Sequence, residues 1–125
     1  MPGILLHLIA GTSLFLIGEY YFRYKYQKLI ERCDHILLFG TCMVFSLIPD
    51  ITLGLYYVFH ISTFETLVVY HYLFQIILIP AVFIGIFLLK FVIHPKKTLI
   101  WMFGMFCILL HIVMDFFIPE YGVWI

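Results

Sequence analysis

Charged residues are scarce in this chain: they make up 11% of its 125 residues, whereas 65% of the residues are hydrophobic. A soluble domain of this size is about a quarter charged and close to half apolar. The shortage of charge therefore excludes an ordinary soluble domain and predicts an integral membrane protein. Basic and acidic residues balance at seven each, so no excess of positive charge predicts nucleic acid as a partner.

Cysteine is also infrequent, and Cys33, Cys42 and Cys107 show no C-x-x-C spacing of the kind that binds metals. An odd number of cysteines without that spacing implies no disulfide framework. We expect each of them to act as a small buried hydrophobic residue. The start of the chain lacks the basic residues and the small-residue cleavage site of a signal peptide, so we expect the first apolar run to be retained.

Four apolar runs are each long enough to cross the hydrocarbon core of a membrane, which takes roughly 20 helical residues. They cover residues 4–22, 36–59, 66–89 and 99–118. The short alternating strands of a membrane barrel are missing, and an open sheet edge cannot lie in lipid. The sequence therefore predicts an all-α fold, a four-helix bundle that forms a single transmembrane domain over residues 1–125.

Positive charge is confined to one side of such a bundle. All seven lysines and arginines lie in or beside the first and third loops: Arg23, Lys25, Lys28, Arg32, Lys90, Lys96 and Lys97. The positive-inside rule puts these loops in the cytoplasm, so we expect both termini on the outer side. The segment 20–35, in which aromatic and charged residues are interleaved, predicts an interfacial helix or a helical extension between the first two membrane helices.

The last predicted helix carries His111 and Asp115, which lie four residues apart and therefore on one helical face. Apart from the thiol of Cys107, these are the only ionisable side chains between residues 99 and 118. An ionisable group inside a membrane helix is costly and indicates a function by default. The two side chains could bind one metal ion or could hydrogen-bond to each other.

Three further polar residues, His7, Asp50 and His71, fall at a similar depth on the predicted topology. At about 1.5 Å of rise per residue, all five lie within roughly 5 to 15 Å of the outer helix ends. Because every helix contributes one or two, the bundle could gather them in one cluster open toward the outer face. Pro49 disrupts helical bonding and would leave Asp50 facing a cavity. Taken singly, the histidines could instead be packing groups, and Asp50 could be a helix cap.

Imidazole nitrogens and carboxylate oxygens suit zinc, manganese or iron, so we expect a divalent metal ion, with zinc as the first choice. The candidate ligands are His7, Asp50, His71, His111 and Asp115. Asp50 and Asp115 are also the candidate catalytic residues, which would orient the attacking water. These residue types leave open whether the site holds one metal ion or two.

The remaining polar groups and the glycines have structural interpretations. We expect His35, His60, His94 and Glu19 at the membrane interfaces. The glycines at positions 11, 40, 85 and 104 are expected where helices pack closely.

Several motifs resemble those of a known family. They are HLIAG near the start, LIPD in the second run, a histidine at the start of the third, and H-x-x-x-D followed by YGV at the end. Over most of its length the chain resembles the YdjM-like family, whose members are small membrane-bound, metal-dependent hydrolases. The resemblance implies a location in the cell (inner) membrane and places the five candidate ligands at the metal or active site. A related likeness to zinc-dependent phospholipase C implies hydrolysis of phosphoesters, including lipid-borne ones.

The leading hypothesis is therefore a membrane-bound metal-dependent hydrolase that acts near the outer leaflet. One alternative is a small cation or proton-coupled transporter, in which the same residues bind the cation and Pro49 is a hinge. Another is a structural membrane subunit with a vestigial site. The expected partners are the lipid bilayer, a lipid or phosphoester substrate, and a second copy of the chain in a homodimer, since four helices offer little shielding to five polar groups.

Overall fold

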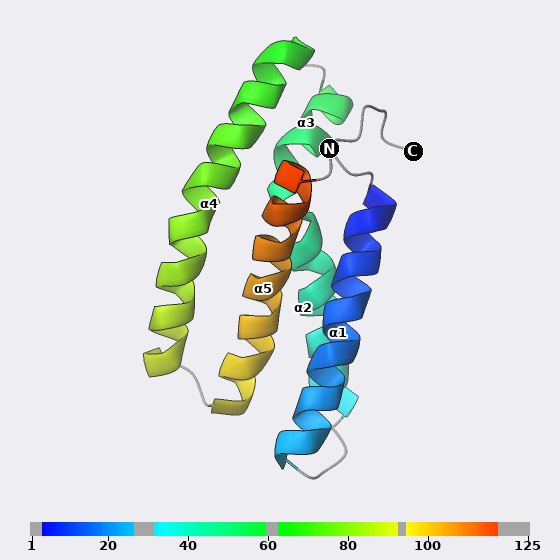
Figure 1. Cartoon of the computed structure of the whole chain (residues 1–125), viewed down its shortest axis with the longest axis vertical. Coiled ribbons are helices and arrows are strands. Elements are labelled where there is room, and N and C mark those ends of the chain that lie inside the picture. Colours follow the sequence, from blue (N-terminus) through cyan, green and yellow to red (C-terminus); the bar gives the residue numbers. More distant parts are fainter. Residues whose placement is uncertain (1–3, 27–31, 60–62, 93–94, 118–125) are drawn as a thin grey trace.

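The computed structural model describes residues 4–26, 32–59, 63–92 and 95–117, and in these ranges the chain is all-helical (Figure 1). The elements are α1 (Ile4–Tyr26), α2 (Arg32–Leu47), the 3₁₀ helix η1 (Ile48–Asp50), α3 (Ile51–Phe59), α4 (Phe64–Val92) and α5 (Pro95–Phe117). Four segments are long and apolar enough to cross a membrane: Leu5–Lys25, Arg32–Asp50, Glu65–Leu89 and Lys97–Phe117. The predicted all-α fold with four potential membrane spans is therefore confirmed.

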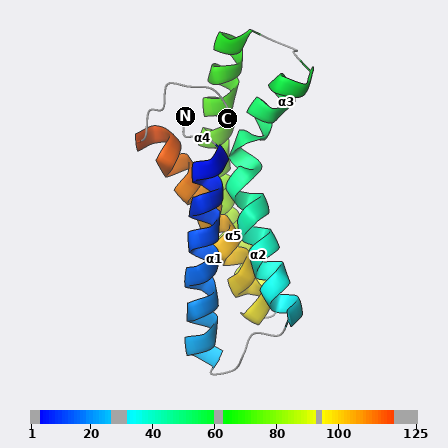
Figure 2. The ribbon, with the colours of Figure 1, turned by 90° about the vertical axis from the view of Figure 1, so that its right-hand side faces the viewer.

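The long helices run alternately up and down, as Figures 1 and 2 show from two directions. Helix α5 packs against α1, α2 and α4, and its contact with α2 is the most extensive. This central place brings the His111–Asp115 face of α5 within reach of the other helices. The start of α1 and the end of α5 lie at the same end of the bundle as α3 (Figure 1).

The second predicted helix is interrupted near its middle. Helix α2 ends at Leu47, and Pro49 lies in η1, after which α3 begins at Ile51. Proline has no N–H to donate, and its ring clashes with the carbonyl of the preceding turn, so it disrupts the helix as the sequence predicts. Figure 2 shows α3 leaning away from the line of α2. Asp50 lies at this interruption, where it is buried.

The segment between the first two spans extends the membrane helices. Helix α1 continues to Tyr26, and α2 begins at Arg32. A separate interfacial helix is therefore not supported, and residues 27–31 lie outside the described residues. The predictions for His60, His94 and the YGV motif at 121–123 also fall outside them.

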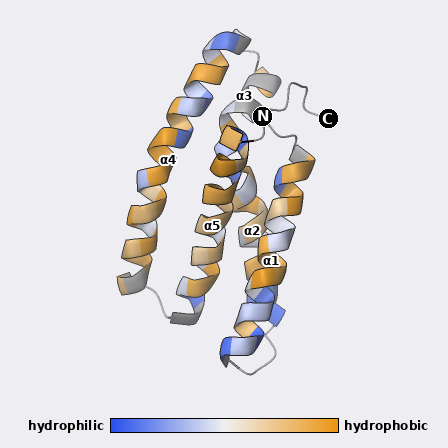
Figure 3. Cartoon of the chain, viewed as in Figure 1, coloured by the Kyte–Doolittle hydropathy of each residue, from blue (hydrophilic) through white to orange (hydrophobic). Residues whose placement is uncertain are grey.

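Apolar clusters hold the bundle together. One joins α1, α2 and α5 through Phe15, Phe22, Leu38, Cys42, Ile100 and Cys107, and another joins α4 to α5 through Val82, Ile108 and Ile112. Many large apolar residues are exposed on the helices, among them Leu16, Val44 and Phe83, as expected of helices that face lipid, and hydrophobic residues dominate the ribbon in Figure 3. Cys42 and Cys107 are buried as predicted, but for Cys33 the prediction is wrong, because it is exposed at the start of α2; all three are free thiols.

Two glycines permit close approach of α2 to its neighbours. A Cβ atom at Gly104 on α5 would overlap the ring of Phe45 and lie 2.5 Å from Thr41 Cγ2, both on α2. A Cβ atom at Gly11 on α1 would lie 2.9 Å from Ser46 Oγ. These contacts confirm the predicted packing roles of the two glycines.

The other two glycines differ from each other. A Cβ atom at Gly85 on α4 would lie 3.1 Å from the terminal methyl carbon of Met105 on α5, so this position is also a packing contact. For Gly40 the prediction is wrong, because a Cβ atom there would meet no atom within 4 Å.

Candidate metal centre

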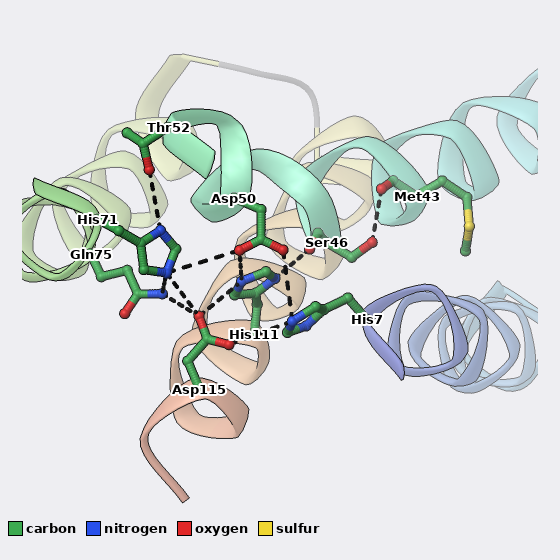
Figure 4. Close-up of polar contacts among 9 residues, drawn as sticks. All are labelled: His7, Met43, Ser46, Asp50, Thr52, His71, Gln75, His111 and Asp115. Atoms are coloured by element: carbon green, nitrogen blue, oxygen red, sulfur yellow. Dashed lines mark hydrogen bonds and ion pairs between the residues drawn. The ribbon is translucent and has the colours of Figure 1, made fainter. Parts of the chain in front are cut away.

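The structure brings all five predicted site residues into one buried cluster (Figure 4). His7 comes from α1, Asp50 from η1, His71 from α4, and His111 and Asp115 from α5. His7 and His71 are 0% exposed, His111 1%, Asp115 4% and Asp50 5%. The side chains of the cluster are therefore almost fully buried rather than open to solvent as predicted, whereas its location toward the outer face stays a prediction.

His111 is oriented by the backbone of α2. Its Nδ1 lies 2.5 Å from the carbonyl oxygen of Ser46. A carbonyl oxygen can only accept, so Nδ1 carries a proton and donates it. In the neutral imidazole the other nitrogen, Nε2, then has no proton and presents its lone pair. This is the form in which histidine binds a metal, with the second ring nitrogen tied to an outer acceptor.

The Nε2 atom of His111 faces negative charge. Nε2 lies 3.1 Å from Asp115 Oδ2 and 3.2 Å from Asp50 Oδ1, yet it makes no hydrogen bond within the described chain. Two carboxylate oxygens and an unprotonated nitrogen are all acceptors, and burial makes their mutual repulsion costly. A cation among these atoms, or a proton on Nε2, removes the repulsion.

His7 adds a second nitrogen on the same side of the carboxylates. Its ring stacks on that of His111, with centroids 3.6 Å apart and an interplanar angle of 11°. His7 Nε2 lies 3.5 Å from Asp115 Oδ1 and 3.8 Å from Asp50 Oδ2. Neither ring nitrogen of His7 has a hydrogen-bond partner within the described chain. Buried polar atoms rarely lack a hydrogen-bond partner. The two nitrogens of His7 therefore point to a ligand that the described protein atoms do not provide.

Four of the five residues form a group that could hold one metal ion. His7, Asp50, His111 and Asp115 each offer a ligand atom, and these atoms all lie within 4.8 Å of one another. Ligands about 2.1 Å from a tetrahedral ion are about 3.4 Å apart, close to the 3.1–3.8 Å between the nitrogens and carboxylate oxygens here. Two carboxylates would also balance the charge of a divalent cation. The donor set fits such an ion without selecting among zinc, manganese and iron.

His71 lies beside this group and has partners of its own. Its Nε2 is 2.8 Å from Gln75 Nε2 and 3.3 Å from Asp115 Oδ2, and its Nδ1 is 3.2 Å from Thr52 Oγ1. Gln75 Nε2 also donates to Asp115 Oδ2. Because an amide nitrogen only donates, His71 Nε2 accepts, and Nδ1 carries the proton toward Thr52.

Reasoning from ionisable residues misses Gln75, Thr52 and the carbonyl of Ser46. Gln75 is fully buried, and it stands four residues after His71, on the same helical face. That spacing is the feature of the sequence that could have identified Gln75 as part of the site. Thr52 follows Asp50 by two residues, in the first turn of α3, and no spacing rule points to a backbone carbonyl.

Glu19 and His35, which are expected at a membrane interface, lie far from the cluster. Glu19 accepts a hydrogen bond from Arg23 at 2.5 Å and lies 3.8 Å from His35 Nδ1. This pair joins the end of α1 to the start of α2, where Lys25 and Arg32 also lie. These contacts do not test whether Glu19 and His35 lie at a membrane interface, so that location stays a prediction.

The fold and the cluster together define a class: a helical protein with four potential membrane spans and a buried histidine–aspartate group that could hold a metal ion. The chain matches no protein-family model, no curated protein and no solved structure.

Proposed function

We propose that this protein is a membrane-embedded, metal-dependent hydrolase whose ion is held by His7, Asp50, His111 and Asp115. The observation that carries the metal centre is the position of His111 Nε2, which has no hydrogen-bond partner within the described chain and faces oxygens of both carboxylates at 3.1 and 3.2 Å. The resemblance to the YdjM-like family supports hydrolysis as the reaction and the cell (inner) membrane as the location.

The ion, when bound, would supply a Lewis acid and make a water molecule more acidic near neutral pH. The chain would contribute the base that orients this water. Asp115 Oδ1 is the best placed atom, because it has no hydrogen-bond partner within the described chain, whereas Oδ2 accepts from Gln75. Asp50 is the second candidate, since it lies at the interruption of the second span.

The resemblance implies a phosphoester substrate, and the position of the cluster bears on the leaflet from which it would come. The described basic residues Arg23, Lys25, Arg32 and Lys97 belong to the helix ends opposite the cluster. The positive-inside rule puts those ends in the cytoplasm and the cluster toward the outer leaflet. A lipid-borne phosphoester of that leaflet is the substrate that we propose. Because the side chains of the site are buried, such a substrate can reach the carboxylates only after the protein around them moves.

The test combines metal content with activity. Detergent-purified wild type should carry close to one equivalent of zinc, manganese or iron by mass spectrometry, and His111→Ala/Asp115→Ala should carry none. Wild type, but not the double variant, should then hydrolyse a phosphoester lipid in mixed micelles. Thr12→Ala is the matched control, because Thr12 is exposed and its hydroxyl bonds a carbonyl of its own helix. A wild type free of metal under every condition would refute the metal centre.

A second candidate function is favoured by the enclosure of the site. Exposures of 0–5% suit a cation held in transit between two membrane faces, and the Pro49 interruption could serve as a hinge. Metal uptake into proteoliposomes that is lost in Asp50→Asn, without any hydrolysis, would favour a transporter.

A further inference from the structure

Gln75 joins two groups of the cluster, the ring of His71 and the carboxylate of Asp115. Its amide nitrogen lies 2.8 Å from His71 Nε2 and also donates to Asp115 Oδ2. The amide has two N–H groups, one for each acceptor. The opposite orientation would bring the amide oxygen against a carboxylate oxygen, so the N–H groups must face the cluster.

The same contact keeps His71 apart from the four-residue group. The lone pair on His71 Nε2 is occupied by Gln75, and the proton on Nδ1 is directed to Thr52 Oγ1 at 3.2 Å. Both ring nitrogens therefore have partners, unlike those of His7. His71 Nε2 lies 3.3 Å from Asp115 Oδ2 and 3.9 Å from Asp50 Oδ1, so a small movement would let it reach an ion bound there.

We infer that Gln75 is a positioning residue, which fixes the Asp115 carboxylate toward His7 and His111 and holds His71 out of the primary ligand set. This inference rests on the proposed metal centre. Outer residues that orient ligands change metal affinity by about 10- to 100-fold when they are removed. Loss of Gln75 should therefore weaken metal binding and also release His71 to become an additional ligand.

The experiment uses the intact chain in detergent, with Zn²⁺ for affinity and Co²⁺ for its visible spectrum, which reports the number and type of ligands. Gln75→Met keeps the length of the side chain and removes both N–H groups. We expect it to bind Zn²⁺ about 10- to 100-fold more weakly and to shift the Co²⁺ spectrum. Gln27→Met, the same change at the chain's other glutamine, should alter neither quantity.

A second variant covers the case in which Gln75→Met fails to fold. Thr52→Val removes the acceptor of the His71 Nδ1 proton, and it should shift the Co²⁺ spectrum in the same direction with a smaller loss of Zn²⁺ affinity. Wild-type affinity and spectrum in both variants would overturn the role of Gln75 while leaving the metal centre intact. A wild type that binds neither ion would overturn the metal centre itself, and the positioning role with it.

Discussion

His111 Nδ1 lies 2.5 Å from the backbone carbonyl oxygen of Ser46, on a different helix. This contact requires a proton on Nδ1, and it directs the other ring nitrogen, Nε2, toward Asp50 and Asp115. The carbonyl is in the last turn of α2, just before Pro49 interrupts the span. The interruption thus provides both Asp50 and the acceptor that orients His111.

The backbone origin of this contact predicts a contrast between two substitutions. Ser46→Ala removes only a hydroxyl that bonds the carbonyl oxygen of Met43 within the same helix, and the Ser46 carbonyl stays. Zn²⁺ affinity should therefore remain within about 3-fold of wild type, since hydroxyl bonds of this kind contribute little. His111→Ala removes the ligand and should abolish binding. Competition with a chromophoric chelator measures both. Equal losses in the two variants would contradict the assignment.

Charge balance predicts how the ion affects stability. Zn²⁺ at 100 times its dissociation constant should stabilise the wild type by about 2.7 kcal/mol. Asp50→Asn removes one of the two buried carboxylates, so most of this stabilisation should be lost. Without metal the variant should be at least as stable as wild type, because the remaining carboxylate no longer faces a second one.

Thermal unfolding with and without Zn²⁺ measures this effect. Asp34→Asn is the matched control, because it is the same substitution in the first turn of α2, away from the cluster. The control should keep the full response to Zn²⁺. An Asp50→Asn protein with the wild-type response would show that Asp50 is not a ligand.

The five site residues are predictable from the sequence because ionisable groups are costly in lipid and stand out among apolar residues. Gln75 is not predictable in this way, because an uncharged amide does not stand out among apolar residues as an ionisable group does. Only its contact with His71 in the structure shows that it belongs to the site. The enclosure of the cluster depends on how the helices rotate about their axes, which stacks His7 on His111. Sequence spacing fixes depth along a helix, but it does not fix that rotation.

Close packing between α2 and α5 predicts a matched pair of glycine variants. Gly104→Ala would force a methyl group against Phe45 and Thr41, so it should destabilise the protein by about 1–3 kcal/mol. Gly40→Ala meets nothing within 4 Å and should change the stability by less than about 1 kcal/mol. Unfolding in a denaturing detergent measures both. The packing account fails if the two variants are equally stable.

Membrane orientation can be read from two positions at opposite ends of the bundle. Cys33 is exposed at the start of α2, near the basic residues, and Thr63 is exposed just before α4. The positive-inside rule puts Cys33 in the cytoplasm. An impermeant maleimide added to intact cells should therefore leave the wild type unlabelled, and it should label Thr63→Cys in a Cys33→Ser background.

Cys42 and Cys107 are buried and should not react in either protein. Labelling of Cys33 from outside, with Thr63→Cys protected, would reverse the orientation and place the metal centre toward the cytoplasmic leaflet.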